Sequence, residues 1–280
     1  MTARPRPLPL LAAAARALGL LAAGAGLAFV VLHTVPSPSD ASARFAWHAT
    51  VLASALFVSN GLLAHRVGGL SWEELGWRPP GGRATWFALG AATGALLAAV
   101  ALGIALPGSG ATLRARVGPT ATLAPLVVAL VAAALFEELV FRGAPLVLLA
   151  QAVGRWPATL LGAVGFGIAH LRNPSATLLG TANIALAAVL LSIAFWSKGG
   201  MPLAWGVHFG WNAGLGLVFG APVSGIALGA ARLSYATGVR PWVDGGAFGP
   251  EGGVAATLAF MVGVAAFVGP RLARPKAWLT

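Results

Sequence analysis

Two adjacent acidic residues and one basic residue lie inside an apolar stretch of the sequence. Glu137, Glu138 and Arg142 fall within residues 132–143, whose other members are Ala, Leu, Val, Phe and Gly. An ionised group near the centre of a membrane costs roughly 2.5–3.5 kcal/mol on the insertion scale, so these side chains must face protein or water. They are therefore candidates for function, and a buried ion network that only holds helices together is the alternative.

Helix geometry gives the two carboxylates different roles. Glu138 and Arg142 are four residues apart with the acid first, which is the favourable order for an ion pair on one helix face. Glu137 lies about 100° around the helix from Glu138 and stays available. The spacing predicts that Glu138 is structural and that Glu137 is reactive, with the chemistry of a general base.

Two histidines in other apolar segments could share this site. A lone histidine in such a segment more often packs between helices, but His170 and His208 accompany an intramembrane glutamate pair. Asn212 follows His208 by one helical turn, so both side chains project from one face. Two donors on one face could stabilise an oxyanion. The same helix carries a ridge of small residues that predicts close packing on a neighbouring helix, Gly206, Gly210 and Gly214.

Composition determines the class of protein that must position these residues. Of the 280 residues, 58% are hydrophobic and only 9% are charged, whereas a soluble domain carries roughly 25% charged residues. An ordinary soluble enzyme and a disordered chain are both excluded. The absence of cysteine excludes disulfides and thiol nucleophiles. The net charge of +11 is spread as single residues between apolar segments, without a basic run, so no nucleic-acid partner is expected.

The remaining class is an all-α polytopic membrane protein, a bundle of about eight transmembrane helices. The fourth apolar segment is too long for one simple span and is expected to tilt, to kink near Pro145 or to continue beyond the membrane. The longest connection, rich in Gly and Pro, is 220–251. The predicted spans are 17–35, 46–64, 84–106, 120–150, 157–170, 176–197, 200–219 and 252–268.

Eight spans place both chain ends on one side of the membrane. That side carries 11 Lys and Arg residues and the other carries 6. The positive-inside rule then predicts both termini in the cytoplasm of a multi-pass protein of the cell (plasma) membrane. The 11 residues are Arg4, Arg6, Arg16, Arg66, Arg78, Arg83, Arg155, Lys198, Arg271, Arg274 and Lys276.

Three short motifs now occur in order on separate apolar segments. They are Glu137-Glu138-x-x-x-Arg142, Phe166-x-x-x-His170 and His208-x-x-x-Asn212. Together they resemble the signature motifs of the CPBP family, the CAAX protease and bacteriocin-processing intramembrane endopeptidases, which include the type II CAAX prenyl endopeptidases. Two flanking stretches also resemble the family, 74–79 and 221–225, so the similarity covers about residues 70–225.

The resemblance implies a role for each motif residue. Glu137 would be the catalytic base that activates a water with help from His170, and His208 and Asn212 would stabilise the oxyanion. The site would be oriented by Glu138, Arg142 and Phe166. The family fold is an eight-helix bundle with a polar cavity reached from the membrane and the cytoplasm. We expect one integral membrane domain over 1–280, with variable N-terminal spans in 1–70, the catalytic core in 71–225 and a loop with the last span in 226–280.

Cofactors and partners follow from the same comparison. No cofactor and no metal are expected, although Glu137, His170 and His208 offer a His₂Glu set that would suit zinc. The expected partners are the lipid bilayer and a peptide or membrane-protein substrate, with or without a lipid anchor. Two other functions stay open: a proton-coupled membrane transporter, because buried Glu, Arg and His also build proton relays, and a non-catalytic membrane immunity or scaffold protein. The Ala-, Gly- and Arg-rich composition is typical of a bacterial, GC-rich coding sequence.

Overall fold

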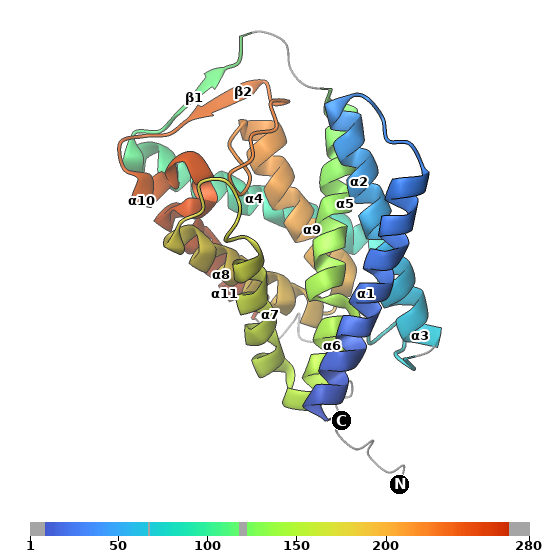
Figure 1. Cartoon of the computed structure of the whole chain (residues 1–280). Helices are drawn as coiled ribbons and strands as arrows, with labels where there is room; N and C mark the ends of the chain where they lie inside the picture. The colour runs from blue at the N-terminus through green and yellow to red at the C-terminus, as the bar shows by residue number, and fades with distance from the viewer. Residues whose placement is uncertain (1–8, 67, 118–121, 269–280) are drawn as a thin grey trace.

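The computed structural model describes residues 9–66, 68–117 and 122–268, and shows a bundle of helices with a small sheet at one end (Figure 1). The chain is an all-α polytopic membrane protein, as predicted. Within the described residues, five helical stretches are long and apolar enough to cross a membrane, namely Leu10–Thr34, Ala41–Arg66, Arg83–Ser109, Leu123–Val153 and Leu178–Trp196. Shorter helices occupy the other three predicted spans.

Several helices are interrupted or extended by other helical turns. The second stretch comprises α2 (Ala41–Leu56), a π-helix η1 (Phe57–Leu63) and α3 (Ala64–Arg66), and the fourth comprises α5 (Leu123–Phe141) and α6 (Gly143–Val153). A second π-helix, η2 (Gly214–Phe219), continues α9 (Gly200–Ala213). The remaining helices of the bundle are α1 (Leu10–Thr34), α4 (Arg83–Ser109), α7 (Arg155–Ala169), α8 (Leu178–Trp196) and α11 (Val254–Phe267).

Local sequence explains where these helices begin and end. The Asp40 carboxylate accepts a hydrogen bond from the Ala43 amide at the start of α2 (2.8 Å), and Thr177 caps α8 through the Gly180 amide (3.0 Å). Gly154 separates α6 from α7 with φ 86°, a conformation that favours glycine.

The long fourth span is broken near Pro145, which is one of the three alternatives expected for it. The break between α5 and α6 falls at Arg142, three residues before Pro145. Proline lacks an amide proton and its ring crowds the carbonyl of the preceding turn, so a straight helix cannot continue through this point. The consequence is that Arg142 leaves the regular helix at the level of the two glutamates.

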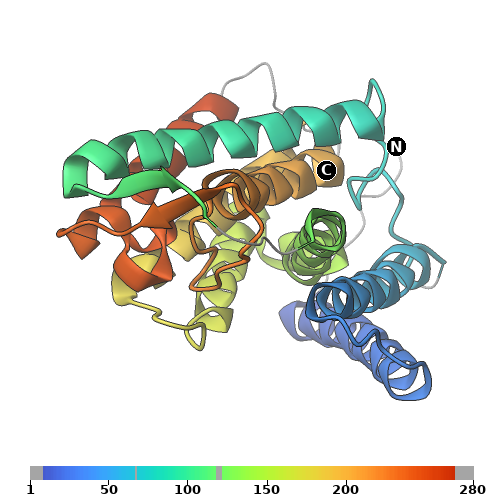
Figure 2. The ribbon, with the colours of Figure 1, turned by 90° about the horizontal axis from the view of Figure 1, so that it is seen from above.

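A glycine-lined contact joins α4 to α9. The two helices run side by side in Figure 2, while α5 is seen nearly end-on. A Cβ atom on Gly206 or Gly210 would collide with the backbone of Phe87 or Ala91 in α4, so both positions require glycine. This is the close packing that the small-residue ridge predicted, and it directs the opposite face of α9 towards α5.

Loops and a small sheet cap one end of the bundle. The strands β1 (Thr112–Ala115) and β2 (Leu233–Ala236) pair antiparallel, and α10 (Pro241–Asp244), η3 (Gly246–Phe248) and η4 (Pro250–Gly252) complete the cap. The buried Asp244 accepts hydrogen bonds from the Gly238 and Gly246 amides at 2.6 and 2.9 Å. The sequence predicted only a long connection here, and it did not predict the two-stranded sheet or the short helices of the cap.

Apart from Arg142, which lies inside a span, the described Lys and Arg residues are divided equally between the two ends of the bundle. Six lie at the end where α1 begins and six at the cap end. The excess behind the predicted orientation therefore comes from residues outside the described part of the chain, Arg4, Arg6, Arg271, Arg274 and Lys276. The cytoplasmic location of both termini stays a prediction.

Candidate active site

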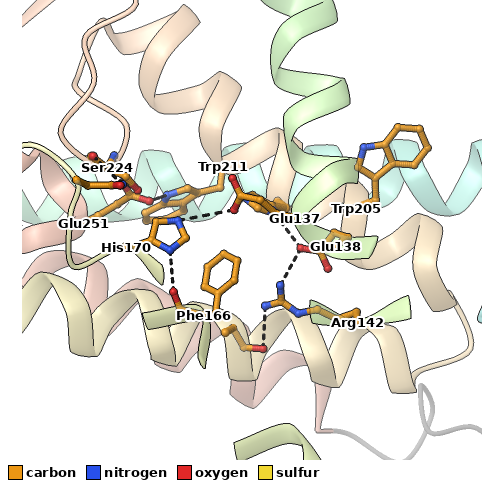
Figure 3. A network of polar contacts seen from close by, with 12 residues as sticks. Glu137, Glu138, Arg142, Phe166, His170, Trp205, Trp211, Ser224 and Glu251 are labelled. Atoms are coloured by element: carbon orange, nitrogen blue, oxygen red, sulfur yellow. Dashed lines mark hydrogen bonds and ion pairs between the residues drawn. The ribbon is translucent and has the colours of Figure 1, made fainter. Parts of the chain in front are cut away.

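Three helices bring the motif residues to one cavity beneath the cap. Glu137 comes from α5 and Phe166 and His170 from the end of α7 (Figure 3), whereas His208 and Asn212 come from α9. All five line a cavity of about 880 Å³, part of which is open to the surroundings. The rest of the cavity wall is largely apolar, apart from Asn173, Ser224 and Glu251.

Glu137 faces both histidines. Its Oε2 atom lies 3.7 Å from His170 Nε2 and 3.7 Å from His208 Nε2. These distances are too long for direct hydrogen bonds. Within the described residues, Oε2 has no hydrogen-bond partner, although 27% of the side chain is exposed to the cavity. The Oε2 atom is itself buried, so it is an unpaired acceptor next to the two rings.

The hydrogen bonds at the Nδ1 atoms of His170 and His208 determine whether the Nε2 atoms, which face Glu137, carry a proton. His170 Nδ1 lies 2.7 Å from the Phe166 carbonyl oxygen, which can only accept, so Nδ1 carries a proton. His208 Nδ1 lies 2.8 Å from Glu138 Oε1 and likewise donates. In the neutral rings, both Nε2 atoms are then acceptors. Each of these acceptors lies 3.7 Å from the Glu137 carboxylate oxygen, and acceptors this close require a shared proton, a water or a cation.

Glu138 and Arg142 form the ion pair that their spacing predicts. Arg142 Nη1 lies 3.2 Å from Glu138 Oε1, and both side chains are buried, at 1% and 0% exposure. A second guanidinium nitrogen donates to the Ala188 carbonyl in α8 at 3.2 Å. Glu138 Oε1 thus accepts from both Arg142 and His208. The carboxylate fixes the His208 ring, and the arginine compensates its charge.

Phe166 does more than fill space. Its ring lies beneath the Arg142 guanidinium, with Cζ 4.6 Å from the ring centroid, and the His170 and His208 rings are 4.5 and 6.1 Å away between centroids. A cation over an aromatic face is stabilised by the quadrupole of the ring. Phe166 therefore contacts the arginine and both histidine rings, and its orienting role stays a prediction.

Asn212 lines the same cavity from α9. Within the described residues its side-chain amide makes no hydrogen bond, so its N–H groups are free to donate. His208 differs, because Nδ1 already donates to Glu138. A hydrogen bond from His208 Nε2 to an oxyanion requires the doubly protonated ring. The sequence could not indicate this condition, which depends on a contact between two helices.

One acidic residue of the cavity was assigned by sequence to an ordinary loop. Glu251, in η4, is 3% exposed and accepts hydrogen bonds from Trp211 and Ser224 (Figure 3). Burial raises the pKa of the Glu251 carboxyl, and these donors oppose the rise. Within the sequence, Glu251 lies among glycines and prolines without periodicity, so only the fold reveals its position.

The cap lies at the end of the bundle opposite the start of α1 (Figure 1). Cap residues such as Ser224 and Glu251 line the cavity. With both termini in the cytoplasm, this end would face the other side of the membrane. The resemblance instead implies a cavity reached from the cytoplasm. The charge count therefore places the cap on the side of the membrane away from the cytoplasm, whereas the resemblance places it on the cytoplasmic side.

The expected zinc alternative has a chemical basis in this geometry. Both histidines donate through Nδ1 and leave Nε2 free, which is the arrangement of most metal-binding histidines. However, no group of three His, Cys, Asp or Glu residues in the described chain has the spacing of a metal site. Glu137, His170 and His208 are therefore residue types that bind zinc, but they do not have the spacing of a metal site.

Comparison with known families agrees with the motifs. Residues 119–214, about one third of the chain, match the family described as Type II CAAX prenyl endopeptidase Rce1-like. Comparison with curated proteins gives no match, and neither does comparison with solved structures. The matched segment contains every motif residue from Glu137 to Asn212. Over the segment that builds the site, the chain is therefore similar to Rce1-like type II CAAX prenyl endopeptidases, as the three motifs indicated.

Proposed function

We propose that this protein is a glutamate-dependent intramembrane endopeptidase of the CAAX prenyl protease type. The observation that carries the proposal is the position of Glu137 Oε2, 3.7 Å from His170 Nε2 and 3.7 Å from His208 Nε2, in a largely apolar cavity. A water between these atoms would donate to two of the acceptors, and Glu137 is the group able to remove its proton. The Rce1-like match supports the same reaction class.

The proton balance of the proposed reaction is closed by Glu137 alone. The carboxylate takes a proton from water as the oxygen attacks the peptide carbonyl carbon, and His170 holds the water through Nε2. The tetrahedral intermediate then collapses, and the C–N bond breaks. Glu137 returns its proton to the leaving nitrogen, so the products are a carboxylic acid and a neutral amine. A positioned general base of this kind contributes roughly 10²–10⁴-fold to the rate.

Asn212 and His208 are the proposed donors to the oxyanion. Asn212 offers unpaired N–H groups, and His208 donates from Nε2 when its ring is an imidazolium between the carboxylates of Glu137 and Glu138. Each donor to a developing oxyanion contributes about 2.7–4 kcal/mol. Glu138, Arg142 and Phe166 would act by holding His208 in place.

We propose that the reaction needs no metal. The base, the water acceptor and the oxyanion donors are all side chains of the chain itself. Zinc bound by Glu137, His170 and His208 would instead act as a Lewis acid. Activity that survives a strong chelator would support the metal-free mechanism, and activity that is lost and restored by zinc would replace it.

The cavity also favours a substrate with apolar character. Its wall includes Leu97, Leu130, Ile184, Leu190 and Phe260, which suit a large apolar side chain or a lipid anchor next to the scissile bond. We therefore propose a peptide or membrane-protein substrate that reaches the site within the cell membrane. A prenylated CAAX peptide is one probe of this class.

The test compares protein N-termini in membranes from cells that express the wild type or Glu137→Gln at matched levels. This substitution removes the base and preserves the size of the side chain. Glu73→Gln is the matched control, because Glu73 pairs with Arg78 on the exposed surface outside the cavity. We expect new termini with the wild type and with the control, and none with Glu137→Gln.

Two outcomes would contradict the proposal. If the same termini appear with Glu137→Gln, the glutamate is not the base. If no termini depend on the protein while Glu137→Gln still rescues a deletion phenotype, the immunity or scaffold function leads. Solute uptake that requires Glu137, without cleavage, would favour the proton-coupled transporter.

A further inference from the structure

Glu251 connects two sides of the cavity through its two carboxylate oxygens. Oε1 accepts from the Trp211 indole N–H at 2.9 Å. Oε2 accepts from the Ser224 backbone N–H and from the Ser224 hydroxyl, the latter at 2.9 Å. The backbone carbonyl of Glu251 is also held, because the Asn183 amide of α8 donates to it at 2.8 Å. A carboxylate with three donors in a buried position is a fixed structural link.

Ser224 lies at the tip of a tight turn that covers the cavity. Residues 223–226 form two backbone hydrogen bonds of 2.9 Å between Val223 and Ile226. The central residues have φ 46° at Ser224 and 85° at Gly225, the pattern of a type I′ turn. A serine in this left-handed region is unfavourable without compensation. The hydrogen bonds from Ser224 to Glu251 supply that compensation.

The same turn is bound to the segment that follows His170. The Asn173 side-chain amide donates to the Ser224 carbonyl oxygen at 3.2 Å. Gly225 packs so closely on the Pro174 carbonyl that a Cβ atom would collide with it. The turn therefore touches the loop three and four residues after His170.

Trp211 provides the connection to the other catalytic helix. It precedes Asn212 directly and follows His208 by three residues in α9. Its ring is buried and packs on Phe260, with centroids 4.4 Å apart. Glu251 thus joins the helix of His208 and Asn212 to the turn that contacts the His170 loop.

We propose that Glu251 is a positioning residue for cleavage: it holds the 223–226 turn against α9 and the His170 loop, and so fixes the separation of His170 from Asn212. This inference rests on the proposed function for its catalytic part. Glu251 lies outside residues 119–214, so the Rce1-like match does not include it. The cap thereby becomes part of the catalytic apparatus.

Hydrogen exchange in the full-length protein tests the link without any substrate. Glu251→Gln keeps the size of the side chain but has only one acceptor oxygen, so it can accept from Trp211 or from Ser224 and not from both. We expect the amides of 223–226 to exchange at least about tenfold faster, which corresponds to about 1.4 kcal/mol of local opening. Amides of α8 should exchange at the wild-type rate, and Glu73→Gln should change neither region.

A second variant tests whether Glu251 acts through Trp211. Trp211→Phe removes the indole N–H, so the glutamine of a Trp211→Phe/Glu251→Gln protein can direct its oxygen to the Ser224 amide. We expect the double variant to recover most of the protection that Glu251→Gln loses. With a substrate found by the comparison of N-termini, kcat should fall about tenfold in Glu251→Gln and stay low in the double variant, because the turn is no longer joined to Trp211, with KM changed less than kcat.

The outcomes separate this inference from the proposed function. Unchanged exchange at 223–226 in Glu251→Gln, or additive effects of the two substitutions, would overturn the positioning role whatever the activity. Wild-type kcat in Glu251→Gln would also overturn it. Faster exchange with rescue in the double variant, but with no cleavage by the wild type, would retain the link and reject the protease.

Discussion

Replacing Arg142 with methionine removes one half of the ion pair at the break between α5 and α6. Arg142 is 1% exposed and makes three interactions: with Glu138 Oε1 at 3.2 Å, with the Ala188 carbonyl at 3.2 Å and with the Phe166 ring at 4.6 Å. Methionine fills most of the space and carries no charge. Glu138, at 0% exposure, is left with His208 as its remaining partner.

The expected magnitude follows from burial. Removing one partner of a buried pair costs about 3–5 kcal/mol, because an uncompensated charge stays in the interior. Glu138→Gln alone should be comparably destabilising, since it leaves the arginine unpaired. In Arg142→Met/Glu138→Gln both charges are gone, so we expect the double variant to be more stable than the sum of the single effects by about 2 kcal/mol or more.

The assay is a double-mutant cycle of unfolding free energies in a fixed detergent micelle, measured by denaturant titration for the wild type and the three variants. Single effects within about 0.5 kcal/mol of zero would show that the pair is not buried and charged in the way described here. Strict additivity would show that the two residues do not interact. Either result would refute the structural role assigned to Glu138.

The remaining predictions concern packing, orientation and metal. Gly210→Ala should destabilise the contact between α4 and α9 by about 1–3 kcal/mol through overpacking. Gly103→Ala, where a Cβ atom would meet open space, should be neutral or slightly stabilising. Equal effects of the two substitutions on thermal unfolding would contradict the close packing of α9 on α4. Because the chain has no cysteine, Val239→Cys in the cap and Lys198→Cys at the opposite end can be labelled singly in whole cells. If both termini are cytoplasmic, an impermeant maleimide should label the Val239→Cys protein and not the Lys198→Cys protein. Labelling of the Lys198→Cys protein alone would support a cavity reached from the cytoplasm. Cleavage should persist after extensive dialysis against a chelator, and loss that zinc reverses would show a metalloenzyme.

Local sequence was sufficient for much of the bundle and for the central network. Apolar segments of membrane length locate the helices, and the four-residue spacing of Glu138 and Arg142 identifies their ion pair because both lie on one helix face. The glycine ridge identified the packing face of α9 for the same reason. Each of these features depends on contacts within one helix or on one helix face.

Features that depend on contacts between distant segments were missed. The strands of the cap are four residues long and more than a hundred residues apart, so no local pattern indicates their pairing. Glu251 becomes buried only because the cap folds onto α8 and α9. The protonated nitrogen of His208 is determined by Glu138, 70 residues earlier in the chain. The orientation stays a prediction, because the charge excess behind it comes from residues outside the described part of the chain.

The most direct measurement of the central claim uses purified protein in lipid vesicles, with chelator present and a synthetic peptide that spans a cleavage site found in cells. Wild type and Glu137→Gln are compared by the rate of product formation. We predict cleavage by the wild type and a loss of roughly 10²–10⁴-fold in the variant, the contribution of a general base. Equal rates would contradict the role of Glu137, and with it the glutamate-dependent mechanism.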